Sequence, residues 1–252
     1  MKRVLITGAH VGIGPETARL LAARNYQVTL VAPIEQQLVA AIKELPGQGH
    51  KYIVADLTTE EDLATVTADL RVQKYDVLIN NTTTGPHGNF TNIPLDQHLG
   101  LMCLNMDVLV MLSHSFLRGA TAGDSLVNIG SILAHASFPG GAVYAGARSF
   151  VVTFSESLSY EFKDKGVFVL GFNPRSTRPG TPAAGGHSDS PAPAGGSVDM
   201  FPDLVLSRAG QVAKQLVDAL EKRVRPHVVH GWKNRLMLFG FRFLSRKLAV
   251  NL

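Results

Sequence analysis

The 252-residue sequence predicts a single-domain α/β protein with a doubly wound parallel sheet. Three observations support this prediction. Short apolar segments alternate with segments of helical periodicity, the apolar segments are hydrophobic at consecutive positions, and a glycine-rich turn follows the first of them. Consecutive apolar positions are typical of strands buried on both faces, which requires helices on both sides of the sheet. In such a fold a ligand is expected at the carboxyl ends of the strands.

Seven segments are expected to form strands, in chain order. Each is a short run rich in Val, Ile, Leu or Tyr: residues 4–6, 28–31, 52–55, 77–79, 125–129, 167–170 and 227–230.

Helices are expected between these strands. Pro15 suits the first turn of the first helix, because its missing N–H would have no partner there. Apolar residues at helical spacing define the next two helices: Leu38, Ala41, Ile42 and Leu45, and then Leu63, Val66 and Leu70. Three more helices are expected over residues 96–117, 143–162 and 209–222.

Residues 178–203 are rich in Pro, Gly, Ala and Ser. Such a composition indicates a flexible loop, either a plain surface loop or a substrate loop that closes over a ligand. Its position after the sixth strand, at the edge where a ligand is expected, favours the substrate loop.

Residues 232–252 predict a basic amphipathic C-terminal helix. Four apolar residues at i, i+4, i+7 and i+11 oppose three arginines: Met237, Phe241, Leu244 and Leu248 against Arg235, Arg242 and Arg246. Packing of this helix over a cleft or against a second subunit is favoured over peripheral contact with a membrane surface.

Composition and charge exclude several classes of function. The net charge of +4 suits an anionic ligand, but no nucleic-acid-binding motif accompanies it. The nine histidines lack metal-ligand spacing, so no metal site is expected. The single cysteine, Cys103, excludes an internal disulfide and fits a reducing, cytoplasmic compartment. We expect neither a signal peptide nor a run of about 18 uncharged apolar residues that would span a membrane.

A glycine-rich turn, residues 7–14, lies between the first strand and the first helix. Gly8, Gly12 and Gly14 allow the backbone to turn tightly and to approach a pyrophosphate, whose charge the helix N-terminus stabilises. A purely structural turn is the alternative, but the strand–turn–helix context favours dinucleotide binding. His10 and Ile13, in the same turn, are included in the predicted cofactor site.

With its TGxxxGxG spacing, this turn resembles that of the short-chain dehydrogenase/reductase family. Further landmarks follow in the family's order: Asp56–Leu57 after the third strand, Asn80–Asn81 at the end of the fourth, Asn105 in the helix over 96–117, and Ser131 followed thirteen residues later by Tyr144. The resemblance covers essentially the whole chain and implies a Rossmann-like fold. Taken alone, Asp56 would fit a helix N-cap and Asn105 a polar residue inside a helix.

The resemblance also implies how the site works. Tyr144 would transfer the proton while the cofactor's hydride reaches the carbon, Ser131 would bind the carbonyl oxygen, and Asn105 would support the proton path. Position 148 lies one helical turn after Tyr144, on the same face. A phenol is a poor acid or base at neutral pH, and a nearby cation favours its phenolate form. Arg148 would therefore assist Tyr144 and also hold the nicotinamide ribose.

Three positions depart from the family's pattern around this site: Thr83 replaces a glycine, Arg148 a lysine, and Arg175 the glycine of a Pro-Gly pair after Pro174. Arginine supplies charge and donors but is a poor proton carrier, because its pKa exceeds about 12. Thr177 is expected to contact the nicotinamide carboxamide. Together these departures leave open the alternative that the protein is catalytically impaired.

Residues 32–34, at the end of the second strand, contain no acid that would bind a ribose 2′-hydroxyl and repel a 2′-phosphate. A protonated His10 would face that phosphate. NADP is therefore the expected cofactor, with NAD as the alternative.

The sequence thus predicts an oxidoreductase that interconverts a carbonyl and an alcohol on a small, hydrophobic substrate. The alternative is a pseudoenzyme that keeps the dinucleotide fold for binding or as a scaffold. The resemblance further implies a homodimer or homotetramer that pairs through the helices over residues 96–117 and 143–162.

Overall fold

The computed structural model describes residues 1–83, 85–135, 137–174, 208–223 and 225–231. The expected substrate loop over 178–203, the C-terminal helix over 232–252, Arg175 and Thr177 lie outside the described residues.

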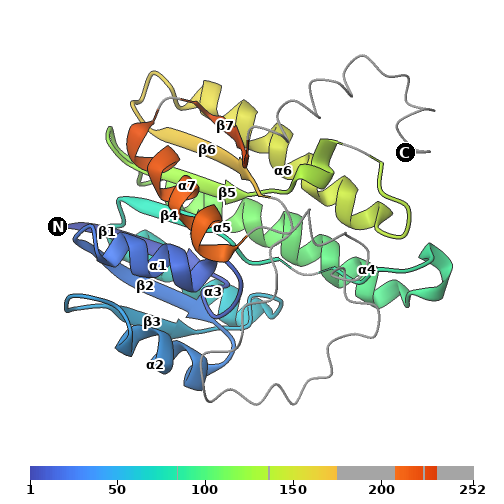
Figure 1. Ribbon diagram of the computed structural model, residues 1–252, viewed down its shortest axis with the longest axis horizontal. Helices are drawn as coiled ribbons and strands as arrows, with labels where there is room; N and C mark the ends of the chain where they lie inside the picture. The colour runs from blue at the N-terminus through green and yellow to red at the C-terminus, as the bar shows by residue number, and fades with distance from the viewer. Residues whose placement is uncertain (84, 136, 175–207, 224, 232–252) are drawn as a thin grey trace.

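Seven parallel strands form one sheet in the order β3-β2-β1-β4-β5-β6-β7 (Figure 1). Their bounds are β1 Lys2–Thr7, β2 Tyr26–Ala32, β3 Lys51–Val54, β4 Val77–Asn80, β5 Ser125–Ile129, β6 Phe168–Asn173 and β7 His227–Val229. The order reverses between β1 and β4, which creates a crevice at the carboxyl ends of these two strands. The predicted doubly wound parallel fold is confirmed.

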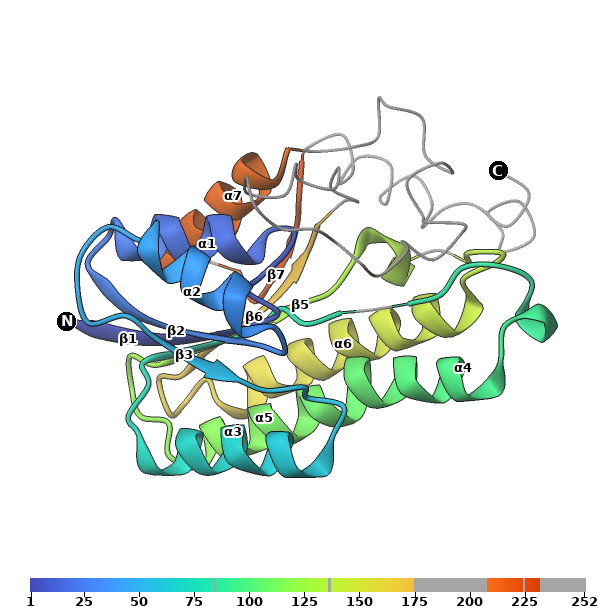
Figure 2. The same cartoon turned by 90° about the horizontal axis from the view of Figure 1, so that it is seen from below.

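Helices cover both faces of the sheet (Figure 2). On one face lie α1 Gly14–Ala22, α2 Glu35–Lys43 and α7 Ala209–Lys222, and on the other α3 Glu60–Val72, α4 Leu95–Met102, α5 Val108–Leu117 and α6 Ala142–Glu161. Short 3₁₀ turns occur at η1 Phe90–Asn92 and η3 Ile132–His135.

Alternate residues of the buried strands enter two separate cores. In β1, Ile6 packs with Leu21 and Leu216 in the core under α1 and α7, whereas Leu5 packs with Leu112 in the core under α3 and α5. Both β1 residues are fully buried. This two-sided burial explains why the strand sequences are apolar at consecutive positions.

The single helix expected over residues 96–117 is interrupted by a π-helical turn, η2 Cys103–Asp107, between α4 and α5. Asn105 sits in this turn, and its Nδ2 donates to Leu101 O at 2.7 Å. The amide side chain of Asn105 is therefore tied to its own helix at the point where the helix widens.

The segment Leu95–Leu117 is long and apolar enough to cross a membrane by length and composition, with a mean hydropathy of 1.5 over its most apolar window. Half of that window is buried inside the protein, and Leu112 and Phe116 belong to the core under α3 and α5. Its burial is that of a core helix in a globular fold.

Candidate functional site

The glycine-rich turn joins β1 to α1 with two residues in the left-handed region, Gly8 at φ +62° and Gly12 at φ +66°. A Cβ on Gly14 would lie 2.8 Å from both Ala9 Cα and Gly8 O, so only glycine fits there. Asn81, at the end of β4, holds the turn in place because its Nδ2 donates to Thr7 O and Gly8 O at 3.1 and 3.0 Å. Asn81 therefore fixes the conformation of the glycine-rich turn.

The same turn leaves room for a pyrophosphate. A Cβ on Gly12 would meet no atom within 4 Å, which shows open space above the backbone at this point. Ile13 is the N-cap of α1, and no side chain caps the first turn of this helix. Free backbone N–H groups at a helix N-terminus attract anions. These residues fit a dinucleotide phosphate.

His10 and Asp56 are the two polar residues predicted to bind the outer part of the cofactor. His10 is half-buried, its Nδ1 has no hydrogen-bond partner in the described part of the chain, and burial lowers its pKa below the ordinary value. It is therefore neutral at pH 7 in the free protein. Asp56 Oδ1 accepts from Thr58 N and Thr58 Oγ1 at 3.0 and 2.7 Å, and Leu57 is buried beneath it.

The N-cap of α3 is Thr59, whose Oγ1 accepts from Asp62 N at 3.3 Å. Asp56 lies three residues earlier and orders the turn without capping the helix. Helix capping therefore does not explain why an aspartate stands at position 56.

A line of buried polar side chains crosses the sheet behind the site. Asn80 Nδ2 donates to Ser113 Oγ at 3.1 Å and to Asn128 Oδ1 at 2.9 Å, and Asn128 Nδ2 donates to Ser155 Oγ at 3.0 Å. These bonds join β4 and β5 to α5 and α6. Asn80 Oδ1 has no partner among the described residues, but the three bonds still fix these elements relative to one another.

Ser131 follows β5 and is buried, with 7% of its surface exposed. Its backbone N–H donates to Asn173 Oδ1 at 3.1 Å, and its Oγ accepts from Leu133 N at 3.2 Å. A Cβ at Gly130 would overlap Asn173 Oδ1, so this glycine is needed for the contact. Asn173 was missed in the sequence, because β6 extends past the predicted end at residue 170 to reach it. Pro174 follows directly, and its O accepts from Ile132 N at 3.1 Å.

Arg148, on α6, is buried to 99%, since only 1% of its surface is exposed. Its Nη1 donates to Ile129 O at 2.9 Å, and its Nη2 donates to Thr83 Oγ1 and Asn105 Oδ1. Its Nε has no partner in the part of the chain that the structure describes. Arg148, Asn105 and Thr83 thus converge although they come from three separate segments.

Tyr144 lies one turn before Arg148, and the Arg148 guanidinium carbon is 4.9 Å from the centre of its ring. This distance is within the range of cation–π contacts. The loop after β4 also approaches the ring, because a Cβ on Gly85 would lie 2.7 Å from Tyr144 Cδ2. The ring therefore contacts both this loop and the guanidinium.

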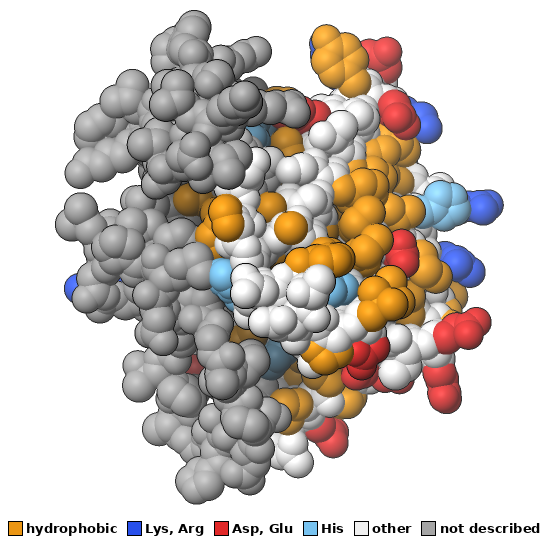
Figure 3. Space-filling view, turned by 90° about the vertical axis from the view of Figure 1, so that its right-hand side faces the viewer, with side chains coloured by type: hydrophobic (Ala, Val, Ile, Leu, Met, Phe, Trp, Pro, Cys, Tyr) orange, Lys and Arg blue, Asp and Glu red, His pale blue; other side chains and the backbone are white. Residues whose placement is uncertain are grey.

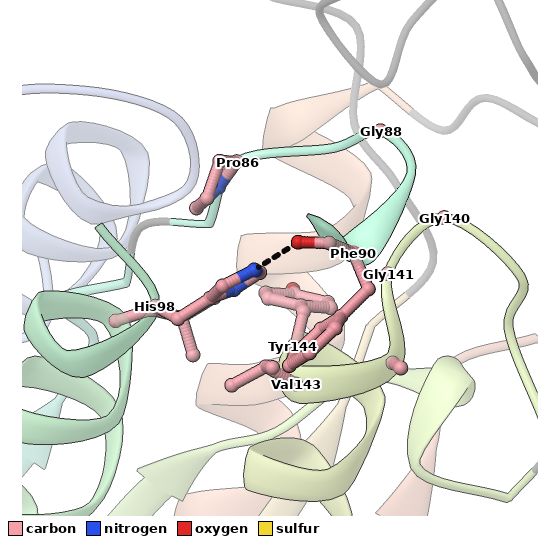
Figure 4. A pocket seen from close by; sticks show the side chains of 10 residues that line it. Pro86, Gly88, Phe90, His98, Gly140, Gly141, Val143 and Tyr144 are labelled. Atoms are coloured by element: carbon pink, nitrogen blue, oxygen red, sulfur yellow. Dashed lines mark hydrogen bonds between the residues drawn. The ribbon is translucent and has the colours of Figure 1, made fainter. Parts of the chain in front are cut away.

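Tyr144 also lines a small pocket of about 30 Å³ (Figure 4). The imidazole of His98 stacks on Phe90 at 4.7 Å and hydrogen-bonds Phe90 O through Nε2 at 3.0 Å. Leu101 and Val143 complete an apolar wall. Ser131 precedes η3, and Ser149 Oγ joins η3 to α6 by donating to Ala134 O at 2.6 Å. Within the described residues, no group of three His, Cys, Asp or Glu side chains could hold a metal ion.

Comparison with known proteins gives consistent matches. The model of the short chain dehydrogenase family matches residues 2–189. A serine 3-dehydrogenase of Agrobacterium fabrum is 30% identical over 182 residues, which cover 68% of this chain and 70% of that protein. A 3-oxoacyl-[acyl-carrier-protein] reductase of Vibrio harveyi is 27% identical over 172 residues, covering 67% and 70%. Among solved structures, a short-chain dehydrogenase of Sphingobium yanoikuyae in complex with NADPH superimposes with a TM-score of 0.81 at 26% identity, covering 96% of this chain and 94% of that one.

Proposed function

Because the chain belongs to the short-chain dehydrogenase/reductase family, we propose that it is an NADP(H)-dependent oxidoreductase that interconverts a carbonyl and an alcohol. The observation that carries the proposal is the Arg148 guanidinium 4.9 Å from the Tyr144 ring, beside an apolar pocket. Tyr144 and Arg148 lie one helical turn apart on the same face of α6, and Tyr144 lines the pocket where a carbonyl group would enter. This placement supports Tyr144 as the group that transfers the proton.

The roles follow from the positions of the side chains. A bound nicotinamide would supply or accept the hydride. Tyr144 would give its proton to the carbonyl oxygen in reduction and remove it in oxidation, and Ser131 Oγ would hold that oxygen. Three of the five N–H groups of Arg148 are used by Ile129, Thr83 and Asn105, and the Nε–H is buried, so Arg148 would hold the ribose through the second N–H of Nη1.

Pro174 and Arg148 would lie beside the nicotinamide, and the glycine turn would hold the pyrophosphate. Residues 32–34 contain no carboxylate to repel a 2′-phosphate. The NADPH complex of the Sphingobium yanoikuyae relative also supports NADP over NAD. Burial lowers the pKa of His10, so the choice of NADP rests on the missing carboxylate rather than on a charge at His10.

Phe90, Leu101 and Val143 line the pocket together with Tyr144, so they would contact the part of a substrate next to its carbonyl group. The names of several relatives agree with a hydrophobic substrate, among them a 3-oxoacyl reductase and a human 17-beta-hydroxysteroid dehydrogenase. Cys103 is a free thiol, which suits the proposed cytoplasmic location.

The experiment is a fluorescence titration with NADPH and NADH, followed by reduction assays over a panel of small and bulky ketones. We expect tighter binding of NADPH and measurable turnover, and comparable or higher turnover in Arg148→Lys, because lysine can carry protons to solvent. A protein that binds NADPH but turns over no ketone, even as Arg148→Lys, would be a dinucleotide-binding module. The engagement of Arg148 by Thr83 and Asn105 is the observation that favours this second function.

We infer that a second copy of the chain covers the outer side of α4 and α5. Hydrophobic side chains gather on the face of the molecule at the α4 end (Figure 3). Leu99 and Met111 are 55% and 46% exposed there, together with Leu95, Met102 and Val110. Exposed apolar patches of this kind mark interaction surfaces. The second copy would bury them.

In sedimentation equilibrium the wild type should therefore have at least twice the mass of one chain. The double variant Leu99→Glu, Met111→Glu should fall to a single chain, because each charge would be buried without a partner. Val72, 79% exposed at the end of α3, offers the control Val72→Glu, which should not change the mass. A monomeric wild type would disprove the inference.

A further inference from the structure

The buried guanidinium of Arg148 is surrounded by neutral groups. Its three hydrogen-bond acceptors are a backbone carbonyl, a hydroxyl and a side-chain amide, those of Ile129, Thr83 and Asn105. No carboxylate of the described residues forms an ion pair with it. A buried cation without a counter-charge depends on every hydrogen bond that it makes, because each acceptor replaces water.

Thr83 has a particular place in this set. Its Oγ1 accepts from Arg148 Nη2 and donates to Asn105 Oδ1 at 3.0 Å. Asn105 Oδ1 also accepts from Arg148, while Asn105 Nδ2 donates to Leu101 O. These hydrogen bonds therefore run in one direction, from the Arg148 guanidinium to the Thr83 hydroxyl and from that hydroxyl to the Asn105 amide oxygen. This order leaves the Thr83 lone pairs free for the arginine.

The two departures at positions 83 and 148 are thus one interaction. A glycine at position 83 would offer no acceptor, and Arg148 Nη2 would keep only Asn105. A lysine at position 148 would place one ammonium where arginine has two separated nitrogens, so it could not bond Ile129 O and Thr83 Oγ1 in the same way.

Resting on the function proposed above, we propose that Thr83 is a positioning residue of the active site. Its hydroxyl holds Arg148 Nη2 so that the guanidinium stays over the Tyr144 ring. Thr83 touches neither substrate nor reacting atoms in this role and acts through Arg148. An arginine at position 148 is functional in this chain because position 83 carries a hydroxyl.

The test compares Thr83→Val, which removes the hydroxyl and keeps the shape, with Thr83→Ser, which keeps the hydroxyl. We expect Thr83→Val to lower kcat by about tenfold to a hundredfold, in line with the loss of a hydrogen bond to a charged group, with KM for the ketone within about twofold. Thr83→Ser should keep kcat within about threefold of the wild type. Thr65→Val is the matched control, since Thr65, like Thr83, is an exposed threonine, and its Oγ1 donates to Glu61 O of its own helix α3.

The decisive arm repeats Thr83→Val in the Arg148→Lys background. There the loss of the hydroxyl should change kcat by less than about threefold, because its partner nitrogen is gone. Urea unfolding of the wild type, Thr83→Val, Arg148→Lys and the double variant should show a coupling of about tenfold or more in the unfolding equilibrium constant. An equal loss of kcat in both backgrounds, equal effects of Val and Ser, or absence of coupling in unfolding would overturn the inference.

The two proposals fail separately. A wild type that binds NADPH but turns over no ketone, even with Arg148→Lys, would overturn the proposed function. The unfolding cycle needs no turnover, so it would still decide whether Thr83 holds Arg148.

Discussion

Replacement of Tyr144 by phenylalanine is expected to lower kcat by about 10²- to 10⁴-fold, the usual contribution of a positioned general acid or base. The change removes the phenolic oxygen alone. The ring keeps its contacts with the Gly85 loop and with the Arg148 guanidinium, whose carbon lies 4.9 Å from the centre of the ring. The affinity for NADPH and the free energy of unfolding should therefore stay close to those of the wild type.

A second tyrosine on the same helix provides the control. Tyr160 lies near the end of α6 and is 84% exposed, so Tyr160→Phe should leave kcat unchanged. Steady-state kinetics with the best ketone of the panel, together with NADPH titration, measures both effects. A Tyr144→Phe protein that kept more than a tenth of the wild-type kcat would show that the proton comes from another group.

The sheet could be predicted closely because burial on both faces leaves a direct trace in the sequence. β5 was predicted with its observed bounds, and α7 likewise. β6 was predicted too short, because Gly171 and Asn173 interrupt the apolar run. Packing against α6 favours glycine at position 171, since a Cβ there would lie 3.1 Å from Ser155 Cβ. Such a preference comes from a neighbouring helix and cannot be seen in the strand itself.

The interruption of the helix over 96–117 shows a similar limit. Its apolar periodicity continues from α4 into α5, so the pattern alone predicts one helix. Asn105 lies in the π turn and bonds both Leu101 O within the helix and Arg148 from α6. Only the second contact distinguishes this asparagine from a polar residue inside an ordinary helix, and it joins residues 43 positions apart.

In the candidate site, too, local motifs were visible in the sequence and contacts between distant segments were not. The spacing of the motifs predicted that Ser131, Tyr144 and Arg148 share one region, and in the structure the Arg148 guanidinium lies over the Tyr144 ring. The sequence presented Thr83 and Arg148 as two separate departures, whereas a hydrogen bond over 65 positions joins them. Asn173 carried no motif at all. The glycine at 130, directly after a strand, was the one local sign that another group approaches the backbone there.

Acidification is expected to destabilise this protein below about pH 6.5 through three half-buried histidines, His10, His135 and His227. Burial lowers the pKa of all three below the ordinary value of about 6.5. His135 and His227 are also close together, with ring centres 5.3 Å apart, and the positive charge of a protonated His227 lowers the pKa of His135 further. The rings come from η3, which follows Ser131, and from β7.

The sign of the effect follows from proton counts. Below about pH 6.5 the unfolded chain binds protons at these histidines while the folded protein resists them, so the free energy of unfolding falls as the pH falls. Above that pH both states are neutral and the contribution is constant. Each histidine adds at most about 1.4 kcal/mol per pH unit, and three together add about 4 kcal/mol per unit.

Glu156 on α6 opposes this trend, because its carboxylate lies 3.3 Å from His227 Nδ1 and raises the pKa of both His135 and His227. Urea unfolding between pH 8 and pH 5 should therefore give a steeper loss of stability in Glu156→Gln than in the wild type. The double variant His135→Gln, His227→Gln should give a shallower loss, since up to two protons leave the balance. If this double variant kept the wild-type slope, the acid sensitivity would lie outside this pair, and the loop that carries Ser131 would not be its origin.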